Sequence, residues 1–179
     1  MSSIVESIRG EFLRYKALAE GALHQVPDSE LARAPGSADN SIAMICWHIS
    51  GNLRSRFTDF LTTDGEKPWR NREEEFVRRS VRRDELLEKW EQGWAVLLEA
   101  LNGLDDGHLT RTVTIRQQPL LVHEALHRSV AHVAYHVGQI VYIAKGLQGN
   151  KWTYLSIPPG ESDRYNTRPD REKPPGGGA

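Results

Sequence analysis

Residues 122–145 concentrate imidazole side chains that could bind a metal ion. They contain two pairs of histidines in which the members are four residues apart, His132 with His136 and His123 with His127. On a helix, residues at this spacing project from the same face, about 6 Å apart along the axis. Each pair could supply two of the nitrogen ligands that a first-row metal ion binds at about 2.1 Å. The two pairs lie roughly 180° apart around the helix, so they cannot bind one ion together.

Both pairs flank the apolar face of this predicted helix. The apolar residues recur with the period of a helix, and they are Leu126, Val130, Val133, Val137, Ile140, Val141 and Ala144. The pair of His132 and His136 lies at one edge of the face. Two small residues on that side, Ala125 and Ser129, leave room for an ion, a water and a substrate. The other pair lies at the opposite edge, so the periodicity favours neither pair, and hydrogen-bonded core histidines without an ion are the alternative interpretation.

A third histidine has the same placement on a second predicted helix, residues 41–61, with Asn40 as its expected N-cap. His48 lies at the border of the apolar face of that helix, which comprises Ile42, Ile45, Ile49, Leu53, Phe57 and Phe60. Cys46 projects about 200° away and is interpreted as a small buried hydrophobic residue. Asp59 lies about 16 Å along the axis, too far to share an ion with His48. The candidate metal site is therefore His48 with His132 and His136, three neutral imidazoles that leave coordination positions open, as catalytic sites do.

Two further amphipathic segments, residues 3–23 and 81–101, complete a set of four predicted helices. Their inward residues are expected to be Ile4, Ile8, Phe12, Tyr15, Ala19 and Ala22 in the first, and Leu86, Leu87, Trp90, Trp94, Leu97, Leu98 and Leu101 in the second. Residues 111–121 alternate β-branched residues and predict a brief extended link or small hairpin. Four long helices with almost no strand predict an all-α fold, a four-helix bundle, in which facing helices can build a metal site.

Composition narrows the class of protein. The chain has 179 residues, 39% of them hydrophobic and 26% charged, as in a single globular domain. The formal net charge of -1 gives no reason to expect nucleic acid as a partner. The basic segment 72–83 is interleaved with acidic residues and is interpreted as solvated. One cysteine fits a reducing compartment, and without a signal peptide or membrane span we expect a cytoplasmic protein.

The C-terminal third carries two more expectations. Residues 152–160 keep apolar anchors and should pack back on the bundle, whereas residues 166–179 offer no core residue and are expected to be a disordered tail.

Gly138 lies inside the last predicted helix, where glycine is about 1 kcal/mol less favourable than alanine. We expect it to mark the close approach of another backbone, from a neighbouring helix, the segment around Trp152 or a dimer partner.

Two stretches of the sequence resemble a known family. Residues 35–48 (PGSADNSIAMICWH) and 131–140 (AHVAYHVGQI) resemble the DinB/YfiT-like superfamily of metal-binding four-helix-bundle proteins. Residues 152–162 (WTYLSIPPGES) are similar to a DinB-like subfamily whose motif runs His-x-x-Tyr-His-Val-Gly-Gln-Ile. The similarity extends to about Tyr165, and it implies an up-down-down-up bundle over residues 1–165 and a homodimer.

The resemblance also implies a metal and a range of reactions. It assigns one ligand on the second helix and two on the fourth, positions that match His48, His132 and His136, and a divalent ion, zinc or nickel. Related members include metal-dependent hydrolases and transferases of low-molecular-weight thiols. We therefore expect a metal-dependent enzyme acting on a small molecule, with activated water or a thiol; a non-catalytic metal-binding, dimer-forming bundle is the alternative. The sequence identifies no general base, and three residues are candidates to orient the substrate or support the ligands: Asn52, Gln139 and Tyr135.

Overall fold

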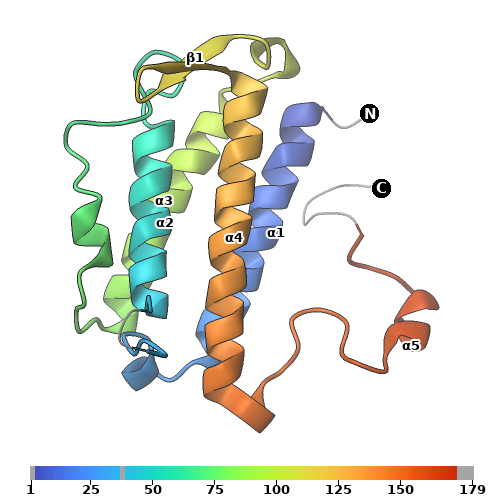
Figure 1. Cartoon of the computed structure of the whole chain (residues 1–179). Helices are drawn as coiled ribbons and strands as arrows, with labels where there is room; N and C mark the ends of the chain where they lie inside the picture. Colours follow the sequence, from blue (N-terminus) through green and yellow to red (C-terminus); the bar gives the residue numbers. More distant parts are fainter. Residues whose placement is uncertain (1–2, 37–38, 173–179) are drawn as a thin grey trace.

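The computed structural model describes residues 3–36 and 39–172. Four long helices lie side by side in it (Figure 1), and they are α1 (Ile4–Gln25), α2 (Ile42–Phe57), α3 (Arg83–Asn102) and α4 (Val122–Gln148). Two of them, α1 and α4, run in one direction, and α2 and α3 run in the other. The shorter elements are η1 (Asp28–Glu30), η2 (Glu73–Phe76), η3 (Asp106–His108), β1 (Thr112–Ile115), β2 (Gln118–Leu121), η4 (Gly149–Lys151) and α5 (Ser162–Asn166). The described chain is mostly helical, as the periodicity predicted.

The core lies between the four long helices. Both tryptophans predicted to be internal, Trp90 and Trp94, are fully buried. The edge of the Trp94 ring meets Phe12 of α1 at 6.4 Å between centroids, and the indole N–H of Trp90 donates to Glu20 at 3.1 Å. These two contacts join α3 to α1, one through the rings and the other through a hydrogen bond.

The second helix differs from its predicted bounds at both ends. Its N-cap is Ser41 and not Asn40, because the backbone of Ser41 is extended and its hydroxyl accepts the Met44 N–H at 3.2 Å. The helix ends at Phe57 and not near residue 61. Thr58 is extended, and its hydroxyl donates to the Arg54 carbonyl at 2.8 Å, while Asp59 takes a positive φ of 49°. The apolar period continues past this end, since Phe60 is still buried in the turn that follows.

Two residues assigned to inward faces are exposed. Ile4 is 55% exposed and Leu87 is 36% exposed, although both fit the apolar spacing of their helices. The adjacent residues Val5 and Leu86 are buried instead, at 1% exposed each. The prediction was wrong for these two positions, because the buried face of each helix passes through the adjacent residue, about 100° around the axis.

A small hairpin closes one end of the helices, as the alternation in residues 111–121 predicted. Strands β1 and β2 pair antiparallel, and the two turn residues, Arg116 and Gln117, have positive φ angles of 53° and 62°. The carboxylate of Asp64 accepts the N–H groups of both turn residues, at 2.8 and 2.7 Å. Asp64 thereby fixes the hairpin to the crossover between α2 and α3.

The segment after α4 returns to the helices, as its apolar anchors predicted. Trp152 and Leu155 pack against the core, and Gln25 exchanges hydrogen bonds with the backbone of Thr153 at 3.0 and 2.7 Å. The tail expected to be disordered, residues 166–179, is described as far as Glu172, where Arg14 of α1 donates to the carbonyls of residues 171 and 172. The rest of that tail lies outside the described residues. Among the residues that the structure describes, no helix is long and apolar enough to cross a membrane.

The glycine that marks a close backbone approach within the chain is Gly93, not Gly138. A Cβ at Gly138 would meet no atom within 4 Å, so no neighbouring helix and no Trp152 segment approaches it. A Cβ at Gly93 in α3 would lie 2.6 Å from the Cα of Ser50 in α2. The expectation for Gly138 was therefore wrong within this chain, and Gly93 is what lets α2 and α3 pack closely.

Replacing these two glycines by alanine should have opposite effects on stability. Gly93→Ala should lower the free energy of unfolding by about 1–3 kcal/mol, because backbone atoms cannot yield to the added methyl group. Gly138→Ala should raise it by up to about 1 kcal/mol through helix propensity alone. Urea denaturation of both variants measures the difference. A stable Gly93→Ala protein would show that α2 and α3 can separate at little cost.

Candidate metal centre

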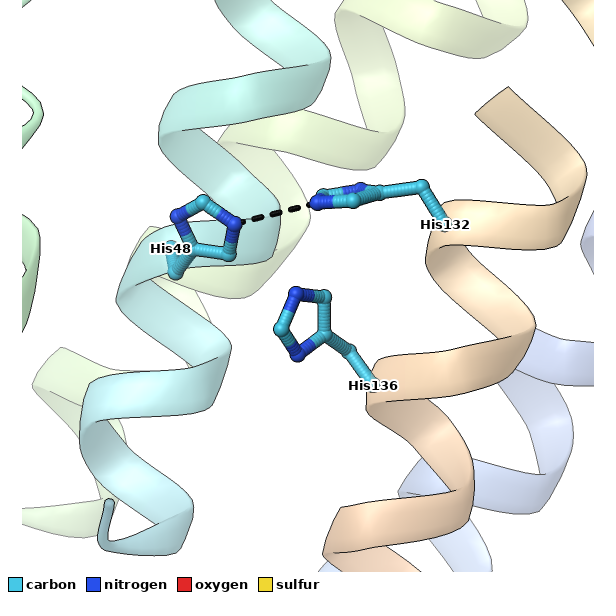
Figure 2. Close-up of side chains that lie close together, drawn as sticks. All are labelled: His48, His132 and His136. Carbon is cyan, nitrogen blue, oxygen red and sulfur yellow. Dashed lines mark hydrogen bonds between the residues drawn. The ribbon is translucent and has the colours of Figure 1, made fainter. Parts of the chain in front are cut away.

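The three predicted ligands converge between α2 and α4. His48 projects from α2 toward His132 and His136, which project from successive turns of α4 (Figure 2). One nitrogen from each ring can be chosen so that all three lie within 4.8 Å of one another. Both His48 and His136 are more than nine-tenths buried, and His132 is half-buried. The pair of His123 and His127 is separate, with 6.0 Å between its ring centroids.

The distance between the rings of His48 and His132 suits a common ion. The Nε2 atoms of His48 and His132 are 3.1 Å apart. Two nitrogens bound to one ion at about 2.1 Å lie roughly 3.0–3.4 Å apart in octahedral or tetrahedral geometry. In addition, Nδ1 of His132 is a buried nitrogen with no hydrogen-bond partner in the described part of the chain. The fit to a bound cation comes from the convergence of three imidazole rings, and this unpaired Nδ1 is not part of the Nε2 contact.

A buried carboxylate sets the tautomer of His48. Nδ1 of His48 donates to Oε2 of Glu75 at 2.8 Å, and Glu75 is only 5% exposed. Because an ionised carboxylate only accepts hydrogen bonds, the proton sits on Nδ1, and Nε2 keeps its lone pair for a metal. Arg70 holds the carboxylate in turn, with bonds of 2.8 and 2.9 Å to its two oxygens. Burial alone would raise the pKa of Glu75, but the hydrogen bonds from His48 and Arg70 hold that pKa below its usual range.

Glu75 and Arg70 were missed in the sequence. Both lie on the crossover between α2 and α3. The interpretation of segment 72–83 as solvated is wrong at Glu75, which is buried, and Arg70 lies just before that segment. The signal that could have found Glu75 is Gly51, three residues after His48 within α2. A Cβ at Gly51 would lie 2.0 Å from Oε1 of Glu75, so this glycine opens the helix surface to the carboxylate. The ring of Phe76 also packs against His48, with 4.7 Å between the two ring centroids.

The three weaker candidates take different places around the histidines. Gln139 lies one turn after His136 on α4, and its Oε1 accepts a hydrogen bond from Nδ1 of His136 at 2.8 Å. That bond fixes Nε2 of His136 as the free nitrogen. Asn52 of α2 lines the adjacent cavity without a bond to a histidine, and Tyr135 is 64% exposed at its rim. Gln139 is thus the one that touches a predicted ligand through a hydrogen bond.

A cavity of about 420 Å³ opens beside the three histidines. Its walls come from α2, the crossover, the hairpin and α4, so segments far apart in the sequence meet there. The volume falls in the range of about 300–1,000 Å³ that is typical of small-molecule sites. The histidines therefore face a space that can hold a small molecule.

The surroundings keep the α4 histidines neutral in the absence of metal. Burial, followed by the charges of His136 and His48, lowers the pKa of His132 to about 3. Burial also lowers the pKa of His136, although the hydrogen bond with Gln139 opposes that shift. Neutral imidazoles are the form that binds metal ions, so both rings are available as ligands at neutral pH.

These pKa shifts predict that the metal-free protein loses stability in acid. An unfolded histidine titrates near pH 6.5, so between about pH 6.5 and 3 the unfolded chain binds more protons than the folded one. The free energy of unfolding should therefore fall as the pH drops through this window. His132→Asn, which cannot take up that proton, should show a shallower fall, whereas His127→Asn should keep the original slope. Urea denaturation of chelator-treated protein at pH 7 and pH 4 tests this, and equal slopes for His132→Asn and the original chain would contradict it.

The helices and the three histidines define a mostly helical protein with a candidate metal centre. The chain belongs to the family described as "Protein of unknown function (DUF1572)", whose family model matches residues 2–161. It is also similar to a solved structure titled "Crystal structure of the conserved protein of locus from Enterococcus faecalis". That similarity has a TM-score of 0.62 and 17% identity, and it covers 83% of this chain and 99% of that chain. At this identity the likeness concerns the fold alone. No curated protein matches the sequence.

Proposed function

We propose that this chain is a divalent-metal-dependent enzyme that acts on a small molecule, with His48, His132 and His136 as the ligands of the ion. The observation that carries the proposal is the convergence of the three histidines at the wall of a cavity of about 420 Å³. A structural metal site is closed by four protein ligands, whereas a catalytic site leaves a position open. Three imidazoles beside a cavity fit the second kind.

The proposal includes the type of bundle and the metal. We assign the chain to the DinB/YfiT-like four-helix bundles, up-down-down-up, as a cytoplasmic homodimer that binds zinc or nickel. The directions of the four long helices and the motif at residues 131–140 support the assignment. Zinc and nickel both accept imidazole ligands, so the residues agree with either ion.

Neighbouring residues keep two of the three histidines in the tautomer that can bind a metal ion. Glu75 and Gln139 each accept the Nδ1 proton of a histidine, so Nε2 of His48 and Nε2 of His136 present lone pairs toward the same space. A divalent ion bound there lowers the pKa of a bound water or thiol toward neutrality. Hydrolysis would use the water, and transfer of a low-molecular-weight thiol to an electrophile would use the thiol.

Metal analysis followed by turnover assays tests the proposal. Protein purified without an affinity tag should contain close to one equivalent of zinc or nickel per chain. A panel of esters and amides, and a panel of electrophiles with and without a low-molecular-weight thiol, then separates hydrolysis from thiol transfer. Activity should disappear with a chelator and return with the ion. Bound metal without metal-dependent turnover on either panel would favour the non-catalytic bundle.

A further inference from the structure

The cavity beside the three histidines is lined by cationic side chains. Five arginines line it, and no aspartate or glutamate does among the described residues; the five are Arg56, Arg70, Arg72, Arg116 and Arg128. Burial lowers the pKa of Arg56, Glu66 opposes this shift, and the charges of Arg70 and Arg116 lower it further. The like charges are therefore close enough to affect one another, and the cavity favours a negatively charged occupant.

Four of these arginines already have carboxylate partners behind the cavity wall. Arg56 and Arg116 share Glu66, at 3.2 and 2.9 Å. Arg70 binds Glu75, and Arg72 lies 3.2 Å from Glu73. These carboxylates do not line the cavity, and of the four pairs only that of Arg72 and Glu73 has both side chains exposed.

Arg128 is the exception. It has no hydrogen-bond or ion-pair partner within the described ranges, 3–36 and 39–172. Glu124 lies one turn earlier on α4, at a spacing that often forms an ion pair. Its carboxylate instead accepts the N–H of Leu121 at 2.7 Å and caps the start of α4. Arg128 therefore presents an uncompensated guanidinium to the cavity, one helical turn before His132.

The neighbouring residue supplies a second unused donor. Ser129 lines the same cavity and is only 7% exposed, and its hydroxyl has no hydrogen-bond partner in the part of the chain that the structure describes. A buried hydroxyl without a hydrogen-bond partner is energetically unfavourable, and such groups often bind a ligand or an ordered water. Both side chains line this cavity, the exposed Arg128 and the buried Ser129, so a ligand in the cavity has both donors within its walls.

Apolar side chains also line the cavity. Phe57, Phe60, Phe76 and Ile115 line it together with the arginines. We infer that the cavity binds a small carboxylate-bearing molecule with an apolar body, its carboxylate held by Arg128 and Ser129 and its reactive group at the three histidines. Arg128 is the lining arginine without a carboxylate partner in the described residues, and a guanidinium forms the paired hydrogen bonds that a carboxylate accepts. This inference rests on the proposed function, since it names the substrate class of the same site.

Binding of simple probes by the full chain tests the inference without turnover. Phenylacetate, phenylacetamide and phenyl phosphate are titrated into chelator-treated and zinc-loaded protein and followed by NMR chemical shifts. Phenylacetate should bind the metal-free protein at least about tenfold more tightly than the neutral amide, because only the carboxylate forms charge-assisted hydrogen bonds. Arg128→Gln should lose about tenfold or more in phenylacetate affinity, while Arg111→Gln, an exposed arginine away from the cavity, should lose nothing.

A second variant separates a ligand contact from a structural role. Ser129→Ala removes a buried hydroxyl that has no partner, so it should leave the melting temperature unchanged or raised. It should nevertheless weaken phenylacetate several-fold, by about the value of one hydrogen bond. A structural serine would lower the melting temperature and leave the affinity unchanged.

Three outcomes would overturn the inference. They are equal affinity for phenylacetate and phenylacetamide, tighter binding of phenyl phosphate than of phenylacetate, and phenylacetate binding that needs zinc and is unchanged in Arg128→Gln. The last would mean that the ion alone binds the carboxylate. Because the main titration uses metal-free protein, its failure is distinct from a failure to find bound metal, which bears on the proposed function instead.

Discussion

Replacing His132 by alanine is expected to reduce the affinity for a divalent ion by more than about 100-fold. Loss of a residue that merely supports a ligand weakens metal binding about 10–100-fold, so loss of a ligand itself should exceed that range. The same result is expected for His48→Ala and His136→Ala, because the three rings converge on one space. Competition titration with a chromophoric chelator gives the affinities, and elemental analysis gives the metal content.

The matched control for this series is the other histidine pair on the same helix. His123→Ala and His127→Ala should keep the metal content and affinity of the original chain, since these rings lie together but apart from the three convergent histidines. Far-UV circular dichroism of all five variants shows whether the helices are retained. Loss of metal in His127→Ala together with retention in His132→Ala would reverse the assignment of the ligands.

The sequence located these histidines because each lies at the edge of an apolar stripe. The spacing in residues 122–145 predicted two usable pairs, and periodicity could not choose between them. The choice depends on which edge of α4 faces α2, and that is set by how α2, α3 and α1 pack around it. His48 from α2 reaches only one of the two edges, so the packing of the helices brings together His48, His132 and His136.

The support of His48 could not be predicted in the same way. Arg70 and Glu75 lie on an irregular crossover, where no period indicates which side chains turn inward. The charges of segment 72–83 suggested solvation, yet the side chains of Glu75 and of Arg70, just before that segment, are nearly fully buried. Their mutual ion pair and the hydrogen bond from His48 to Glu75 compensate their burial, and in an irregular segment such contacts leave no periodic pattern in the sequence.

The different roles of two helical glycines could not be predicted from the sequence either. The sequence places Gly93 and Gly138 inside predicted helices, and local propensity treats them alike. Only the crossing point of α2 and α3 distinguishes them, since a Cβ at Gly93 would lie against the backbone of Ser50, while one at Gly138 would be in open space. Which residues meet across two helices depends on how the helices are placed relative to each other. That placement is set by the packing of the whole core and not by a local stretch of sequence.

The buried carboxylate leads to the second large effect. Glu75→Gln is expected to weaken metal binding about 10–100-fold, because the neutral amide holds the Nδ1 proton of His48 less firmly and makes the ring a poorer ligand. The same change leaves the buried guanidinium of Arg70 without its counter-charge. Breaking a buried ion pair in this way typically lowers the free energy of unfolding by about 3–5 kcal/mol. Glu74→Gln, at an exposed neighbouring position, is the matched control and should change neither quantity.

A double variant separates the two roles of Glu75. Arg70→Met combined with Glu75→Gln removes both charges, so much of the lost stability should return, as it does when buried ion pairs are replaced by apolar residues. The metal affinity should stay low, because His48 still lacks a carboxylate at Nδ1. Urea denaturation of the metal-free proteins and chelator competition of the metal-loaded ones measure the two effects separately. If the double variant recovers the original metal affinity along with its stability, Glu75 serves only as the counter-ion of Arg70 and does not position His48.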